Sequence, residues 1–332
     1  MAASPPLLLG EVPQGEGFSH ILMADSNSIK IFSPATVANV ACGFDILGFA
    51  LDHPGDEIQV RLKDAPGITV LNQTKDTVFP ADVNKNTAVV SLQAYLAHLG
   101  SEQGFEIIFT KKIKPGSGIG SSSASAAASV FAVNELLGNP LSKENLVQFA
   151  MQGEKAACGV AHADNVAPAL LGGFVLVRSY SPLDIISIPY PAELYCTIIH
   201  PQIEVKTEDA RKILRQGISL KDAVKQWGNV GGLIAGLMKG DYALIGRSLE
   251  DAIIEPIRSI LIPGYDAVKE AALKAGALGC CISGSGPSMF ALSRSQEEAN
   301  QIASAMKKAF TRYEIDNIDY VSKVNSQGPK VI

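Results

Sequence analysis

The chain has 332 residues, more than one ordinary hydrophobic core accommodates, which predicts two packed domains. Hydrophobic residues make up 47% and charged residues 18%, a globular composition, and no apolar run approaches the roughly 20 residues that cross a bilayer. The net charge of −5 argues against a nucleic-acid-binding protein, which would normally carry a basic face.

The cysteines favour a reducing compartment, and we expect a cytoplasmic protein. Their number is odd and no Cys-x-x-Cys pair is present, so neither a disulfide scaffold nor a zinc site is predicted. The five are Cys42, Cys158, Cys196, Cys280 and Cys281.

Residues 1–25 differ from the rest because prolines and glycines interrupt any periodicity. The run Leu7-Leu8-Leu9 is too short for the core of a signal peptide and no basic residue precedes it. We expect this segment to be a disordered extension or an added leader, and Met23 could be the native start.

In the first half, apolar periodicity predicts strands and helices that alternate irregularly. The expected strands are 29–33, 57–62, 104–110, 172–179 and 195–200. The expected helices are 86–99, 121–137 and 142–153, with a glycine- and serine-rich turn at 114–120.

The second half is richer in predicted helices. These are 207–216, 219–227, 229–239, 241–253, 264–275 and 295–310, and the predicted strands are 278–282, 287–292 and 318–323. Because strands and helices do not follow strict βα repeats, we expect an α+β fold. Prolines cluster near 180–193, so we place the domains at residues 26–185 and 186–332.

The strongest chemical signal is the glycine-rich turn, where three glycines permit close backbone approach to a ligand and three serines open a helix. A helix N-terminus presents free N–H groups to an anion, and serine hydroxyls are suitable ligands for Mg²⁺. The segment is Lys114, Pro115, Gly116, Ser117, Gly118, Ile119, Gly120, Ser121, Ser122 and Ser123.

Two familiar glycine motifs do not fit this turn. A P-loop has lysine and then serine or threonine after its last glycine, whereas Gly120 is followed by Ser121. The dinucleotide motif needs a different glycine spacing and an acid on the next strand, and the nearby Glu135 lies inside the expected helix. A simple turn before an alanine-rich helix remains the alternative.

Two further motifs flank the turn in the chain. Asn39 and Asp45, in Pro-Ala-Thr-Val-Ala-Asn and Gly-Phe-Asp, have the chemistry to bind a zwitterion, although an isolated pair would more often satisfy its own turn. Residues 283–288, Ser-Gly-Ser-Gly-Pro-Ser, form a turn between two expected strands, which alone would be mostly structural.

Together these motifs, from about residue 30 to 292, resemble the GHMP kinase superfamily, with Ile119 replacing the usual leucine of its phosphate loop. The first and third motifs resemble the homoserine kinases in particular. The resemblance implies a ribosomal protein S5 domain 2-like N-terminal domain and a ferredoxin-like C-terminal domain. It also implies ATP and Mg²⁺ as cofactors, and it is compatible with a homodimer.

The resemblance also implies roles for individual residues. Glu154 and Ser122 would bind Mg²⁺, the loop from Pro115 to Ser123 would bind the ATP phosphates, and Asn86 would lie near the adenine. The amino-acid substrate would be held by Asn39, Asp45, His162, Asn165, Arg211, Arg258 and Gly284. A guanidinium can bind a carboxylate through two hydrogen bonds, which suits an amino acid with a free side-chain hydroxyl.

The implied reaction is transfer of the γ-phosphoryl group of ATP to the hydroxyl of L-homoserine, a step of threonine biosynthesis. Catalysis would rest mainly on positioning and electrostatics. Catalytic roles fall to Glu154, Asn165 and Asp164, but whether Asp164 is a base or Asn165 alone orients the hydroxyl stays open.

Three alternatives remain: another GHMP kinase such as a mevalonate kinase, a ligand-sensing relative without activity, and a nucleic-acid-binding protein of similar fold. The first is disfavoured by the arginine pair with Asp45, which suits an amino acid. The second is disfavoured because Glu154 and the loop serines are present, and the third because the chain is acidic overall.

Overall fold

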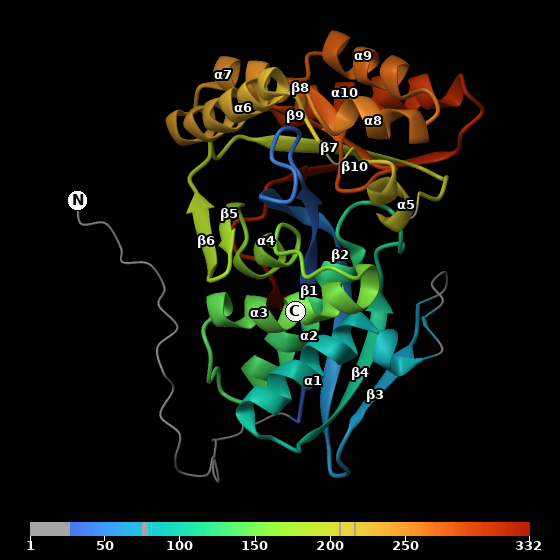
Figure 1. Cartoon of the computed structure of the whole chain (residues 1–332). Helices are drawn as coiled ribbons and strands as arrows, with labels where there is room; N and C mark the ends of the chain where they lie inside the picture. Colours follow the sequence, from blue (N-terminus) through green and yellow to red (C-terminus); the bar gives the residue numbers. More distant parts are fainter. Residues whose placement is uncertain (1–26, 75–78, 81, 206, 216) are drawn as a thin grey trace.

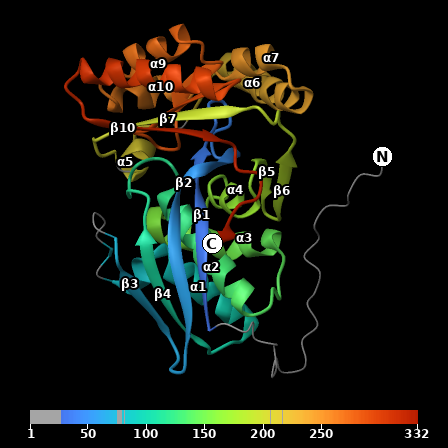
Figure 2. The ribbon, with the colours of Figure 1, turned by 180° about the vertical axis from the view of Figure 1, so that it is seen from behind.

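The computed structural model describes residues 27–74, 79–80, 82–205, 207–215 and 217–332. Two sheets, each with helices on one face, are stacked along the molecule (Figure 1). Seen from behind, the end of the chain returns from the second sheet to the first (Figure 2). The expectation for residues 1–25 lies outside the described residues.

The first sheet has seven strands, with β11, β1, β2, β4 and β3 in spatial order and β5 and β6 branching from β2. Among the strand pairs of this sheet that the structure describes, only β3–β4 is parallel. The strands are β1 (Ser28–Ala38), β2 (Leu47–Lys63), β3 (Ile68–Asn72), β4 (Gly104–Lys111), β5 (Phe174–Tyr180), β6 (Leu183–Ile188) and β11 (Lys330–Val331).

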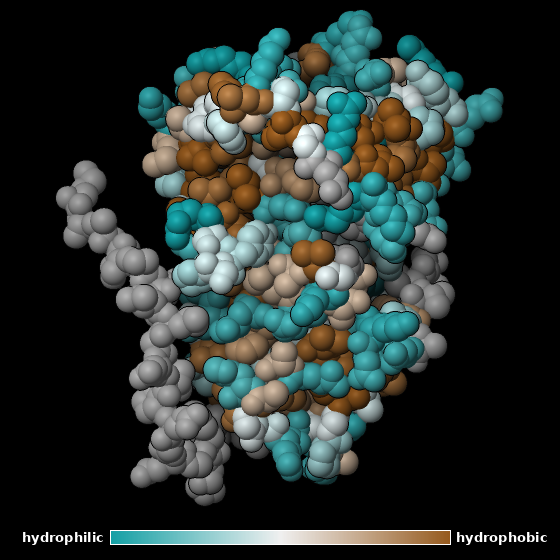
Figure 3. Space-filling model, viewed as in Figure 1, coloured by the Kyte–Doolittle hydropathy of each residue, from teal (hydrophilic) through white to brown (hydrophobic). Residues whose placement is uncertain are grey.

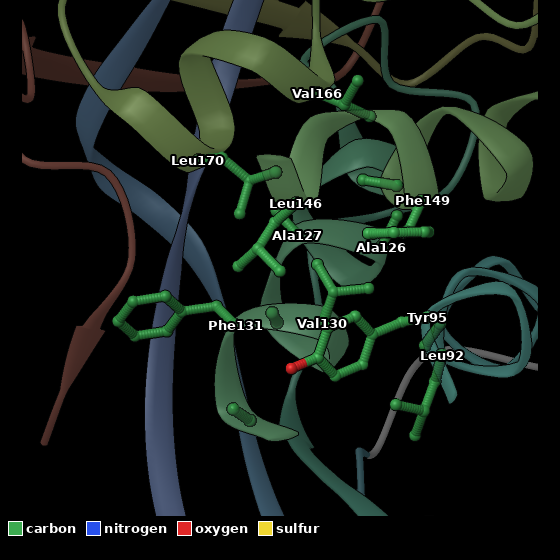
Figure 4. Close-up of a cluster of buried hydrophobic side chains, with 14 of the residues drawn as sticks. Leu92, Tyr95, Ala126, Ala127, Val130, Phe131, Leu146, Phe149, Val166 and Leu170 are labelled. Atoms are coloured by element: carbon green, nitrogen blue, oxygen red, sulfur yellow. The ribbon is translucent and has the colours of Figure 1, made fainter. Parts of the chain in front are cut away.

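Helix α2 (Ser121–Leu136) lies at the centre of the N-terminal domain, in contact with β1, β2 and three helices. It is rich in alanine and serine and almost entirely buried, because small side chains let neighbouring elements approach on every side. Figure 4 shows how Val130 and Phe131 of α2 pack among the surrounding side chains. Its neighbours are η1 (Val83–Lys85), α1 (Thr87–Leu99), α3 (Lys143–Cys158) and α4 (Val166–Leu171).

The second sheet has the strand order β10, β7, β9, β8, and all its pairs are antiparallel. This order, with helices between β7 and β8 and between β9 and β10, is the ferredoxin-like arrangement. The strands are β7 (Tyr195–Pro201), β8 (Gly279–Ile282), β9 (Met289–Ser293) and β10 (Asn317–Lys323). The helices are α5 (Thr207–Lys212), α6 (Leu220–Lys239), α7 (Tyr242–Ser248), α8 (Glu255–Arg258), η2 (Ser259–Leu261), α9 (Tyr265–Lys274) and α10 (Gln296–Thr311).

A shared apolar core joins the two domains. Phe49 of β2 stacks on Phe174 at 4.5 Å between ring centroids and meets Phe290 of β9 edge-on at 6.1 Å. All three rings are fully buried. The sheets are therefore packed against each other through aromatic side chains from both domains.

The α+β architecture is confirmed, but several predicted boundaries are wrong. The predicted helices 219–227 and 229–239 form the single helix α6, because Gly228 costs a helix only about 1 kcal/mol and buried Leu233 and Leu237 anchor the continuous helix. The predicted helix 241–253 ends already at Ser248. The sequence patterns did not reveal β3, β6, α4, α8 or β11.

The proposed domain boundary at residue 185 falls within β6, which pairs with β5 along its length. We therefore propose that the N-terminal domain extends at least to Ile188.

We expect Phe49→Ala to lower the free energy of unfolding by about 3–5 kcal/mol, because it leaves a cavity where the two domains meet. Urea denaturation followed by tryptophan fluorescence and circular dichroism would measure this change. Ile260→Ala, at a side chain that is 76% exposed, is the control and should change stability by less than about 0.5 kcal/mol. Equal effects of the two substitutions would contradict this account of the core.

Candidate active site

A cavity of about 1040 Å³ lies where the two domains meet. The glycine-rich loop, the loop that follows β1 and the segment around residues 154–165 line it from the N-terminal domain. Arg211, Arg258 and the turn at Gly284 line it from the C-terminal domain. Segments far apart in the chain thus meet at one site.

The cavity contains most of the residues predicted from the sequence. Those lining it are Asn39, Asp45, Asn86, Pro115, Gly116, Gly118, Gly120, Ser121, Ser122, Glu154, His162, Asp164, Asn165, Arg211, Arg258 and Gly284. Ser117, Ile119 and Ser123 do not line it, and each is almost fully buried.

The glycine-rich loop needs glycine at two positions for reasons of space as well as backbone conformation. Gly118 and Gly120 have positive φ angles of 79° and 68°. A Cβ atom at Gly118 would lie 2.6 Å from the carbonyl oxygen of Gly286, and one at Gly120 would lie 2.0 Å from Thr36 Oγ1. The loop is therefore packed tightly against both domains.

Three consecutive carbonyl groups of the loop accept hydrogen bonds from outside it. Ser288 Oγ donates to the Ser117 carbonyl at 2.6 Å, Ser283 Oγ to the Gly118 carbonyl at 2.8 Å, and the backbone N–H of Thr36 to the Ile119 carbonyl at 3.2 Å. In a planar trans peptide the N–H points opposite to the carbonyl. The next N–H groups therefore point away from these partners, an arrangement that suits an anion beside the N-terminus of α2.

Glu154 provides a buried carboxylate beside this helix. Its Oε1 accepts a hydrogen bond from Ser123 Oγ at 2.9 Å, and its side chain also interacts with Ser122. Burial raises the pKa of Glu154, while the two serines and the Lys112 ammonium oppose that shift. A carboxylate and the hydroxyl of Ser122 in one cavity are hard oxygen ligands of the type that Mg²⁺ binds.

At the other end of the cavity, Asp45 and Arg211 form a two-pronged ion pair with distances of 3.0 and 3.2 Å. Arg211 also donates to His162 Nε2 at 2.9 Å, which makes Nε2 an acceptor and leaves the ring proton on Nδ1, 3.6 Å from Asp45. Burial is the main cause that lowers the pKa of His162, and the Asp45 charge opposes it. The three side chains form one charged cluster.

Arg258 is the second guanidinium and is 3% exposed. It donates to the carbonyl groups of Ala210 at 3.0 Å and Gly284 at 3.2 Å. Burial, followed by repulsion from Arg211, lowers its pKa to about 10, so it stays protonated at neutral pH. Two cations lie close together here, and a ligand carboxylate would relieve their repulsion.

Asn39 lines the cavity and also stabilises its own loop. Its Oδ1 accepts from the backbone N–H of Asp45 at 3.0 Å, and its Nδ2 donates to the Gly284 carbonyl at 2.7 Å. The loop it stabilises holds Asn39, Val40, Ala41 and Asp45 at positive φ. Such strain persists only where the surroundings fix the backbone, and it is concentrated here beside the charged cluster.

Asn165 and Asp164 lie between the two ends of the cavity. Thr36 Oγ1 donates to Asn165 Oδ1 at 2.7 Å, which leaves the amide NH₂ group as a donor. Burial, followed by the charges of Asp45 and Glu154, raises the pKa of Asp164 to about 7. Asp164 therefore changes its protonation state close to neutral pH.

Asn86 begins α1, where its Oδ1 accepts from the backbone N–H of Ala88 at 3.0 Å. Around it the cavity is lined by Phe79, Pro80 and Phe109, an apolar region of a kind that suits a planar base.

Sequence reasoning did not identify four residues that shape the site. Thr36, Ser283 and Ser288 hold the glycine-rich loop, and the Phe44 ring lies 5.4 Å from Arg211 and 5.0 Å from Arg258. All four lie within the sequence motifs described above, but the sequence did not reveal which residues they contact.

Comparison with known proteins identifies the superfamily of the chain. The family model described as "GHMP kinases N terminal domain" matches residues 86–173, and that described as "GHMP kinases C terminal" matches residues 233–312. The crystal structure of L. major mevalonate kinase in complex with R-mevalonate shares the fold, with a TM-score of 0.68 at 18% identity, and covers 91% of this chain and 99% of that one.

Relatives of higher sequence identity identify the family within the GHMP kinases. A homoserine kinase of Chlorobium phaeobacteroides (strain BS1) is 49% identical over 314 residues, covering 91% of this chain and 98% of the relative. The crystal structure of homoserine kinase from Cytophaga hutchinsonii has a TM-score of 0.90 at 60% identity, covering 94% of this chain and 99% of that one. The chain belongs to the homoserine kinase family of the GHMP kinases.

We expect Gly120→Ala to weaken ADP binding at least tenfold, because the added methyl group would overlap Thr36 Oγ1 and distort the glycine-rich loop. Isothermal titration calorimetry would measure the dissociation constant. Gly116→Ala is a matched control, since Gly116 has a similar φ of 72° but no atom within 4 Å of the added Cβ. Equal losses in both variants would show that backbone strain, rather than the close approach, is responsible.

Proposed function

We propose that this protein transfers the γ-phosphoryl group of ATP to the side-chain hydroxyl of L-homoserine, giving O-phospho-L-homoserine for threonine biosynthesis. The observation that carries this proposal is one cavity with an anion-binding glycine-rich loop at one end and Asp45, Arg211 and Arg258 at the other. Relatives named homoserine kinase, 49% identical over most of the chain, support the choice of substrate.

The charged cluster fits the head group of an amino acid. Arg211 and Arg258 would bind the α-carboxylate, and Asp45 would bind the α-ammonium group. Asp45 and Arg211 pair with each other without a ligand, so the head group would exchange this ion pair for two new ones. A neutral sugar or mevalonate lacks the ammonium group and would leave Asp45 without that partner.

The nucleotide would lie along the glycine-rich loop, with its base toward Asn86 and its phosphates at the N-terminus of α2. Glu154 and Ser122 would hold Mg²⁺, and the fit rests on the buried carboxylate of Glu154 beside two serine hydroxyls. At this position the ion would supply positive charge that offsets the charge of the phosphates. The chain's own groups then position the acceptor.

The acceptor hydroxyl would lie near Asn165 and Asp164. We propose that the free NH₂ group of Asn165 orients the hydroxyl oxygen, while ionised Asp164 accepts its proton. A carboxyl with a pKa of about 7 is well suited to this exchange at neutral pH.

We propose a cytoplasmic location for the protein. Cys42, Cys196, Cys280 and Cys281 are buried free thiols, which fits a reducing compartment. Separately, none of the helices in the described part of the chain could span a bilayer.

A homodimer also stays a prediction. Apolar side chains gather in the upper part of Figure 3, over the C-terminal domain. Leu220, Val224 and Trp227 are exposed on successive turns of α6, a pattern that is common at subunit contacts.

In an ADP-release assay with Mg-ATP, we expect L-homoserine to be phosphorylated faster than L-threonine, L-serine, mevalonate or galactose. Arg211→Ala should raise KM for homoserine at least tenfold, since the ligand carboxylate loses one guanidinium. Glu154→Ala should reduce kcat at least 100-fold. Lys212→Ala, at a 65% exposed side chain on the same helix as Arg211, is the control and should behave like the parent protein.

If mevalonate or a sugar were phosphorylated fastest, the assignment to the GHMP kinases would stand, but L-homoserine would be rejected as the substrate. Nucleotide binding without turnover of any acceptor would favour the ligand-sensing alternative.

We expect kcat/KM for homoserine to rise as pH increases through about 7, because protonated Asp164 cannot accept a proton and ionised Asp164 can. Asp164→Asn should remove this inflection and lower kcat roughly 10²–10⁴-fold. A pH profile from 5.5 to 9 with both proteins measures the effect. A variant that keeps the inflection and most of the activity would assign the hydroxyl to Asn165 alone.

A further inference from the structure

Lys112 forms a buried ion pair beneath the glycine-rich loop. Its Nζ lies 3.0 Å from Asp56 Oδ2, and the two side chains are 7% and 0% exposed. The same ammonium donates to the carbonyl and to the hydroxyl of Ser121, both at 2.6 Å. Lys112 thus connects β2 to the first residue of α2.

The partners of this pair fix both ends of the loop. Asp56 accepts from the backbone N–H of Ile113 at 2.8 Å and from Ser125 Oγ at 2.7 Å, and Ser121 Oγ donates to the Ile113 carbonyl at 2.8 Å. Ile113 precedes the loop, and Ser121 and Ser125 follow it in α2. The network therefore closes the loop at its base.

Stability alone does not explain a buried pair of charges. Removing two ions from water is costly, and well-packed apolar side chains often serve as well or better. Of the three nearby lysines, only Lys112 lines the cavity. Lys111 pairs with Glu57 at the surface, and Lys114 donates to Gln202. Among Lys111, Lys112 and Lys114, the buried ammonium is therefore the one that reaches the cavity, which the more distant Lys85 also lines.

We propose that Lys112 is a positioning residue for the nucleotide, which fixes the first turn of α2 and supplies positive charge to the phosphates. This rests on the proposed function, in which the glycine-rich loop binds the phosphates of ATP. Nζ donates two hydrogen bonds to Ser121 and lies in an ion pair with Asp56, so we infer that Lys112 acts through its charge and through Ser121. The ion pair as a whole is neutral, but Lys112 lines the cavity and Asp56 does not, so the positive end of the pair lies toward the phosphates where water is largely excluded.

The test compares ADP dissociation constants, measured by calorimetry without homoserine, in the parent protein and in four variants. Lys112→Met should weaken ADP at least tenfold, while Lys112→Arg should stay within about threefold because it retains the charge. Lys111→Met, at an adjacent lysine that is 57% exposed, should stay within twofold. In turnover assays Lys112→Met should raise KM for ATP and leave KM for homoserine within about threefold.

The fourth variant separates charge from structure. Lys112→Met combined with Asp56→Asn removes both ions, so no unpaired charge remains buried. The amide oxygen can still accept from the backbone N–H of Ile113, and the NH₂ group can donate to Ser125 Oγ, whose hydroxyl then donates to the Ser121 carbonyl. We expect this double variant to regain much of the melting temperature lost by Lys112→Met and to bind ADP as weakly. Recovery of ADP affinity together with stability would overturn the proposal, as would normal affinity in Lys112→Met. If the parent protein itself bound no ADP, the proposed function would fail instead.

Discussion

The site depends on the fixed orientation of the peptide groups from Ser117 to Gly120. Three glycines with positive φ give this loop many accessible shapes, so it cannot hold one conformation by itself. Donors outside the loop select that conformation, and two of the three are hydroxyls of the C-terminal domain, Ser283 and Ser288. Because those serines are in place only when the domains pack together, the apolar contact around Phe49 is also a condition for anion binding.

Charge is distributed unevenly along the cavity, and the carboxyl groups of Asp45 and Asp164 therefore have different surroundings. Asp45 lies against Arg211 and serves as a partner for cations. Asp164 lies between Asp45 and Glu154 without an ion pair of its own among the described residues, so burial and both negative charges raise its pKa to about 7. Two aspartates in one cavity thus differ in their proposed roles, Asp45 in binding a cation and Asp164 in proton transfer, because their surroundings differ. Phe44, close to both guanidinium groups, lessens the cost of holding two cations near each other.

The sequence was sufficient for the α+β fold, because the motifs and the periodicity of the longer elements are local. It was also sufficient to name about half of the residues that line the cavity, since the family resemblance joins motifs that are far apart in the chain. It was insufficient where the outcome depends on tertiary contacts. The sequence alone did not reveal that Asn39 donates to the Gly284 carbonyl of the other domain while it also lines the cavity. Lys111, Lys112 and Lys114 look alike in the sequence, but β4 ends with Lys111 opposite Glu57, and the next residue, Lys112, pairs with Asp56.

The turn at residues 283–288 links the two ends of the cavity through neighbouring residues. Ser283 holds the Gly118 carbonyl, while the carbonyl of Gly284 accepts from Arg258 and Asn39. A shift of this turn would therefore alter the loop proposed for phosphates and the guanidinium proposed for the carboxylate at the same time. Since an in-line transfer requires donor and acceptor at fixed separation, one rigid turn that carries both contacts keeps the two substrates in register. The C-terminal domain thus contributes geometry to the nucleotide site as well as side chains to the acceptor site.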